Sequence, residues 1–205
     1  MIDLPGISAR DLSGIIGEIY DCSLDPTLWP ATCRKIAALC EGTAGGICVH
    51  DLRQAQNDQV FVFGYEQEFL QKLGQHYAES PMAIADIVAK LGDVKALSME
   101  DPGFAESRFS TQVLQPFGLK DILWFPALRT GTRMASMHAS RGEEMPYFQQ
   151  RDVSALRLLA PHVCRALAIS TCSTSGRCDR NCWRRHWPDS SPAFSSRRAT
   201  ATSST

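Results

Sequence analysis

The chain has 205 residues, 44% of them hydrophobic, which is enough for one domain with a buried core and a tail. Residues 1–170 carry 15 Lys and Arg against 20 Asp and Glu, whereas the remaining residues carry 6 Arg against 2 Asp. This acidic body excludes a primary nucleic-acid surface within it, because neutralising phosphates needs clustered basic side chains.

The start of the chain lacks the pattern of an export signal. No basic region is followed there by an apolar core, and no uncharged apolar run in the chain approaches the roughly 18 residues of a membrane span. The sequence therefore predicts a cytoplasmic protein without a membrane partner.

Two helices are expected before residue 41. Ser8, with Asp11 three residues later, forms a weak capping box for the first helix. Asp25 as N-cap and Pro26 at the first helical position mark the start of the second. Each helix carries one apolar face, so the two can pack together.

A strand hairpin follows the two helices. Residues 47–52 and 59–64 are typical of strands, and a polar loop joins them. Helical spacing then returns over residues 65–78, after Pro81 through Leu91, and over residues 104–115.

A second antiparallel hairpin is predicted from residues 121–129 and 133–140, which flank the short turn Thr130-Gly131-Thr132. Pro126 lies within the first of these strands. Because proline cannot donate to a strand ladder, we expect it at an edge or a bulge.

The last ordered element is a predicted helix over residues 149–169, in which Pro161 predicts a kink near Arg157. Apolar residues step by three and four positions and predict a seam for dimerisation and signalling: Val153, Leu156, Ala160, Val163 and Leu167. Together the elements predict an α+β fold of the PAS or GAF kind, in which an antiparallel sheet is flanked by helices and followed by a long signalling helix.

Spaced landmarks between Leu12 and Ile169 carry a resemblance to a known family. They are Ile16-Gly17-Glu18-Ile19-Tyr20-Asp21 with Leu24-Asp25-Pro26 and Trp29-Pro30, then Gly64-Tyr65, His76-Tyr77, Pro81, Pro116-Phe117-Gly118-Leu119, and Leu158 to Val163 with Arg165-Ala166-Leu167. In this order they resemble the N-terminal GAF/PAS-like sensory region of LuxR-type helix-turn-helix transcriptional regulators. The resemblance implies a cytoplasmic sensory module, typically joined through a signalling helix to a DNA-binding helix-turn-helix.

The last 35 residues differ in composition from the body. After Ile169 there is no Leu, Ile, Val or Met, while Ser, Thr, Arg, Cys and Trp are frequent. Such a segment cannot build a core, so residues 1–170 are expected to form the sensory domain and residues 171–205 a disordered basic tail. One hypothesis is a shifted reading frame, because out-of-register GC-rich codons give this composition. The chain is then a truncated form, and DNA binding is expected of full-length relatives but not of this chain.

Catalytic and metal chemistry find no positive support in the sequence. There is no nucleophile elbow, P-loop or paired-histidine zinc motif, and His50 and Asp51, being adjacent on a strand, point to opposite faces. We therefore expect no catalytic residues, no cofactor and no metal site. Zinc binding by the tail is an alternative, although the spacing of its candidate ligands is not one of the usual patterns: Cys172, Cys178, Cys182 and His186.

A ligand pocket is the remaining candidate site, against the competing interpretation of ordinary core packing. Aromatic residues on the strands could close it, and His138 shares a strand face with Met134 and Ser136. The predicted lining is Phe61, Phe63, Tyr65, Trp124, Met134 and His138. The sequence thus predicts a domain that senses a small-molecule or protein effector and forms a homodimer through its last helix. A free-standing module that sequesters a ligand or partner and an unrecognised hydrolase using His50 and Asp51 are alternatives.

Overall fold

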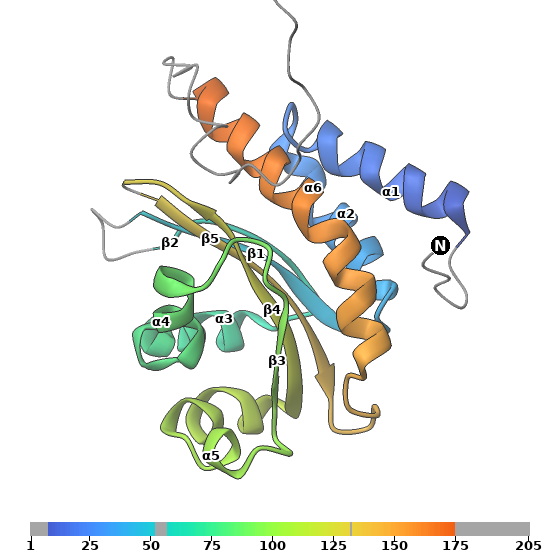
Figure 1. Ribbon diagram of the computed structural model, residues 1–205. Helices are drawn as coiled ribbons and strands as arrows, with labels where there is room; N and C mark the ends of the chain where they lie inside the picture. Colours follow the sequence, from blue (N-terminus) through green and yellow to red (C-terminus); the bar gives the residue numbers. More distant parts are fainter. Residues whose placement is uncertain (1–7, 52–56, 132, 175–205) are drawn as a thin grey trace, which may run out of the picture.

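The computed structural model describes residues 8–51, 57–131 and 133–174. Its centre is a five-stranded antiparallel sheet in the order β2-β1-β5-β4-β3 (Figure 1). The strands are β1 (Ala44–Asp51), β2 (Asn57–Phe63), β3 (Lys95–Ser98), β4 (Leu119–Arg129) and β5 (Arg133–Gly142). Both predicted hairpins are confirmed, since β1 pairs with β2 and β4 pairs with β5.

Helices cover both faces of the sheet and form two separate layers (Figure 1). One layer contains α1 (Ala9–Asp21), α2 (Trp29–Ala38) and α6 (Gln150–Thr174), and its side chains form the larger hydrophobic core with the sheet. The other contains α3 (Gln67–His76), α4 (Pro81–Val88), α5 (Pro102–Ala105) and a π-helical turn, Ser110–Leu114, around a second apolar cluster. The predicted α+β, GAF-like architecture is confirmed.

The caps of the first two helices follow the sequence closely. The Ser8 side chain accepts a hydrogen bond from the Asp11 amide at the start of α1, as predicted. Asp25 accepts from the Thr27 amide, but the residues it caps, Pro26–Leu28, form a 3-10 turn, and α2 begins only at Trp29. The predicted start of the second helix is therefore three residues early.

Pro126 lies at a bulge, which is one of the two positions, edge or bulge, expected for it. Strand β4 is internal, but its register with β5 shifts between Pro126 and Leu128, and its pairing with β3 ends at Trp124. The missing amide of Pro126 therefore costs no regular ladder bond, while its carbonyl accepts from the Gly92 amide at 2.8 Å.

The layer of α3 and α4 departs from the sequence prediction. In α4 the apolar residues Ile84, Ile87 and Val88 are 67%, 59% and 74% exposed, whereas Asp86 is 1% exposed. Helical spacing predicted the helix, but the apolar residues at that spacing face solvent. The helix predicted over residues 104–115 is divided between α5 and the π-helical turn, and strand β3 was not predicted.

The apolar stripe of helix α6 packs against the core of its own chain. Leu156, Ala160, Val163 and Leu167 are buried in the larger core, and Val153 packs against that core. The stripe predicted as a dimer and signalling seam thus packs on the chain's own sheet, because the same three-and-four spacing also serves to dock a helix within one chain. Helix α6 runs without a break through Pro161.

Among the described residues, one helix, α6 over Gln150–Thr171, is long and apolar enough to cross a membrane. Its apolar stripe is buried on the sheet, and the core helix of a soluble protein meets the same criterion. Helix α6 extends to Thr174 and so includes the first four residues of the predicted tail, with the candidate zinc ligand Cys172 among them. The rest of the predicted disordered tail, the shifted frame and the other three candidate zinc ligands, Cys178, Cys182 and His186, lie outside the described residues.

The packing of α6 makes a stability prediction. Replacing Leu156 by Ala deletes buried methyl groups and leaves a cavity, so we expect urea unfolding to show a loss of about 2–5 kcal/mol. The matched variant Ile169→Ala, on the exposed side of the same helix, should lose less than about 1 kcal/mol. Equal losses for both variants would contradict the burial assigned to the stripe.

Candidate ligand-binding site

A small cavity of about 20 Å³, not fully enclosed, lies between the sheet and the α3–α4 layer. Its volume is sufficient for about one water molecule. The sheet and the covering segments both contribute to its lining: Cys48, Tyr65, Phe69, Leu73, Tyr77, Met82, Phe109, Leu114, Ile122, Ser136 and His138.

Alternation along the strands places the polar lining groups. Cys48 on β1 is paired with Ser136 on β5, and His138 follows two residues later on the same face. The intervening Met137 points into the larger core on the other side of the sheet. The polar lining and the main core are thus built from the same strand.

Aromatic rings cover these polar groups. The ring of Tyr65 is stacked between Phe69, at 4.6 Å, and His138, at 5.6 Å, measured between ring centres. Its hydroxyl lies 2.6 Å from Ser140 Oγ on β5, which anchors the ring to the sheet. The start of the α3 segment is therefore fixed by one hydrogen bond and two ring contacts.

A buried carboxyl holds α4 over the cavity. The Tyr77 hydroxyl donates to Asp86 Oδ2, and the Ser136 side chain is a further hydrogen-bond partner of Asp86. Arg129 on β4 donates to the backbone carbonyls of Asp86 and Ala89 at the C-terminal end of α4. Polar contacts thus replace the apolar anchoring that the exposed side of α4 does not supply.

Burial controls the protonation of these groups. It raises the pKa of Asp86 from 3.8 to about 6, against the opposing hydrogen bonds of Tyr77 and Ser136 and the charge of Arg129. Burial also lowers the pKa of His138 to about 4, with a smaller contribution from His50. At neutral pH the His138 imidazole is therefore uncharged.

The potential nucleophiles of the cavity are not activated. Burial raises the pKa of the Cys48 thiol to about 12 and raises that of the Tyr65 hydroxyl above its ordinary value. A protonated, buried thiol is a poor nucleophile. This arrangement of neutral polar and aromatic groups is suited to binding a molecule.

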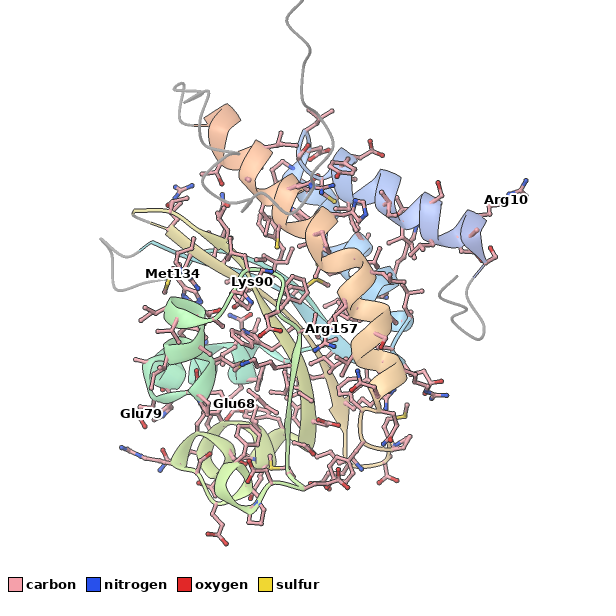
Figure 2. All side chains as sticks on the ribbon, in the orientation of Figure 1. Arg10, Glu68, Glu79, Lys90, Met134 and Arg157 are labelled. Atoms are coloured by element: carbon pink, nitrogen blue, oxygen red, sulfur yellow. The ribbon has the colours of Figure 1, made fainter. Side chains whose placement is uncertain are left out.

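A larger depression of about 470 Å³ adjoins the small cavity. Tyr65 and Phe69 line both, so their side chains separate the two spaces. Phe69 also meets the ring of Phe117 edge-on at 5.4 Å between ring centres. The rim carries Glu68, which Figure 2 shows on the side of the sheet opposite α6.

The six residues predicted for the pocket are only partly brought together. Tyr65 and His138 line the cavity, while Trp124 is buried in the surrounding apolar cluster and pairs with His138 across the strands without lining it. Met134 lies near the β4–β5 turn, away from the lining (Figure 2).

Phe61 and Phe63 lie on the wrong face for the predicted pocket. Phe63 is buried in the larger core beneath Arg34, and Phe61 packs against the same core. The sequence alternation of β2 is clear, but nothing in it indicates which face carries the cavity.

Several lining residues were not predicted. Two of them had a sequence indication, because Tyr77 belongs to the His76-Tyr77 landmark and Ser136 shares the strand face of His138. Cys48 and Ile122 lie on strands β1 and β4. The other five come from covering segments whose folding over the sheet is a long-range event: Phe69, Leu73, Met82, Phe109 and Leu114.

The raised pKa of Asp86 predicts a pH-dependent effect of Asp86→Asn. The folded protein holds the proton more tightly than the unfolded chain, so wild type loses stability relative to the neutral variant as pH rises from about 4 to about 6. We expect the stability difference between variant and wild type to change by about 2 kcal/mol in favour of the variant over this range. Urea unfolding at pH 4, 5, 6 and 7.5 measures it, and a difference independent of pH would contradict the burial of the carboxyl.

Comparison with known proteins gives a fold relationship. No protein-family model and no curated protein sequence matches the chain. The ligand-binding domain of VqsR from Pseudomonas aeruginosa matches over 80% of this chain and 98% of its own, with a TM-score of 0.60 and 10% identity. CepR2 from Burkholderia cenocepacia, an N-acylhomoserine lactone dependent LuxR family transcription factor, matches over 78% and 93%, with a TM-score of 0.54 and 17% identity.

A GAF domain provides a third structural match. The phycoerythrobilin-bound GAF domain of a cyanobacterial phytochrome covers 82% of this chain and all of its own, with a TM-score of 0.55 and 14% identity. The described domain therefore has the fold shared by GAF domains and the ligand-binding domains of LuxR-family regulators, as the sequence landmarks predicted.

Proposed function

We propose that this chain is the effector-sensing domain of a LuxR-type transcriptional regulator and that it acts in the cytoplasm. The observation that carries the proposal is the small cavity on one face of the sheet, lined by aromatic rings and neutral polar groups. The fold shared with LuxR-family ligand-binding domains supports it.

The sheet connects the cavity to the output helix. Strand β5 carries Ser136 and His138 on the cavity side, and its alternate residues Ala135, Met137 and Ala139 belong to the core that holds α6. A ligand that displaces β5 therefore alters the support of α6. Ligand binding can shift such an equilibrium only by binding the two arrangements with different affinity.

Arg141 at the end of β5 strengthens this connection. Its side chain is 0% exposed and donates to the carbonyls of Cys40 and Pro146, at 2.6 and 3.0 Å. It also lies 3.4 Å from the carboxylate of Asp152 in the first turn of α6. The guanidinium thus joins the strand, the connecting loop and the helix.

Removal of this guanidinium should destabilise the domain. Arg141→Met removes the buried cation of Asp152 and leaves only Arg151, an exposed side chain 3.5 Å from the carboxylate, so we expect a loss of about 3–5 kcal/mol in urea unfolding. Arg10→Met is the matched control, because Arg10 lies exposed at the outer end of α1 (Figure 2), and should change stability by less than about 0.5 kcal/mol. An Arg141→Met variant as stable as wild type in urea unfolding would contradict the proposed connection between β5 and α6.

Effector binding is tested by a thermal-shift screen of small molecules on the full chain. We expect at least one compound to raise the melting temperature of wild type, because a ligand that binds the folded state stabilises it. The effect should be lost in Ser136→Leu, which fills the cavity, and retained in Ser13→Leu, which makes the same exchange on the exposed side of α1.

Circular dichroism first establishes that Ser136→Leu is folded. Compounds that raise the melting temperatures of wild type and Ser136→Leu equally bind elsewhere on the protein. A screen in which every stabilising compound behaves in this way would contradict the proposed sensing cavity.

A further inference from the structure

His138 is a buried polar side chain without a hydrogen bond among the described residues. Its ring is 9% exposed, lines the cavity and contacts Tyr65 by stacking only. A neutral imidazole offers one N–H donor and one nitrogen acceptor. Since buried polar groups are nearly always hydrogen-bonded, His138 is available to a bound molecule.

The neighbouring polar groups are already engaged. The Tyr65 hydroxyl is bonded to Ser140, and the Tyr77 hydroxyl and Ser136 are bonded to Asp86. The protonated Cys48 thiol is only a weak donor. His138 is thus the strongest unused hydrogen-bonding group of this lining.

The cavity lining has no charged side chain that could balance the charge of an ionic ligand. Its lining contains no Lys, Arg, Asp or Glu, and Arg129 is already directed to the backbone of α4. An ion placed there would lose its hydration without gaining a partner of opposite charge. The carboxyl of Asp86 lies behind Tyr77 and Ser136 and further disfavours an anion.

The walls also set the shape of the ligand. Rings of Tyr65, Phe69, Tyr77 and Phe109 line the small cavity, and aromatic rings pack favourably edge-on or offset against one another. The small cavity must expand to take even one ring. Phe69 lines both this cavity and the larger depression, so a displacement of its ring would join two existing spaces.

We propose that the cavity binds an uncharged, single-ring aromatic molecule whose amide or hydroxyl group hydrogen-bonds to His138. This inference rests on the proposed sensing function and narrows its ligand class. His138 is the specificity-determining residue, and the apolar rings contribute the remaining affinity.

Isothermal titration of the full chain at pH 7.5 tests the ligand class with probes of nearly the same shape. Benzamide is neutral, benzoate is anionic and benzylamine is cationic, while toluene lacks a hydrogen-bonding group. We expect benzamide to bind at least tenfold more tightly than benzoate or benzylamine. A charged probe that binds as tightly as benzamide would overturn the ligand class, as would the absence of binding by all four probes.

His138→Phe separates recognition from packing. The variant keeps a ring of similar size and loses the hydrogen bond, so benzamide should bind about five- to tenfold more weakly. Toluene should bind within about twofold of its wild-type affinity, since it forms no hydrogen bond. An equal loss for both probes would assign His138 a purely structural role and overturn the proposal.

The two proposals can fail separately. If benzoate binds tightly to wild type and Ser136→Leu abolishes this binding, the neutral ligand class is overturned while the sensing role stays supported. A compound screen without any cavity-dependent binder would instead remove the sensing role itself.

Discussion

Strand β5 presents different chemistry to the two faces of the sheet, and the core and the cavity both depend on this alternation. Ala135, Met137 and Ala139 are buried against the helices, whereas Ser136 and His138 lie on the other side. A slip of one residue would exchange the two sets. The pairing of β5 with both β1 and β4 over most of its length prevents such a slip.

The two layers on the sheet are held by different forces. The α1, α2 and α6 layer buries a large apolar cluster, including the whole stripe of α6. The α4 segment instead buries Asp86 and leaves Ile84, Ile87 and Val88 in solvent. A layer with fewer buried apolar contacts opens at lower free energy than the main core. The stable layer is therefore suited to transmit a change, and the weaker layer is suited to admit a ligand.

The connection between these layers explains how α6 can respond without a seam of its own. Its apolar stripe is fully used on the sheet, so a partner would have to contact other residues of the helix. Arg141 and Asp152 fix the start of the helix to β5, the strand that also carries His138. A change in the sheet thus reaches the helix through contacts within one chain.

Local features of the fold could be predicted from the sequence, whereas features set by distant contacts could not. The Ser8 cap and the two hairpins depend on neighbouring residues, and all three are confirmed. The same periodicity rules failed for α4, because tertiary contacts of Asp86 override the apolar spacing of its neighbours. For the site, strand alternation linked His138 to Ser136 but could not tell that Phe61 and Phe63 face the other layer.

Hydrogen exchange of backbone amides tests most directly the claim that one sheet carries a stable layer and a weaker, ligand-admitting layer. Amides of α6 and of the central strands should exchange near the rate set by global unfolding. Those of α3 and α4 should open at a free energy lower by at least about 2 kcal/mol. Equal protection of α4 and α6 would contradict the account, because the cavity would then have no segment that opens independently of the core.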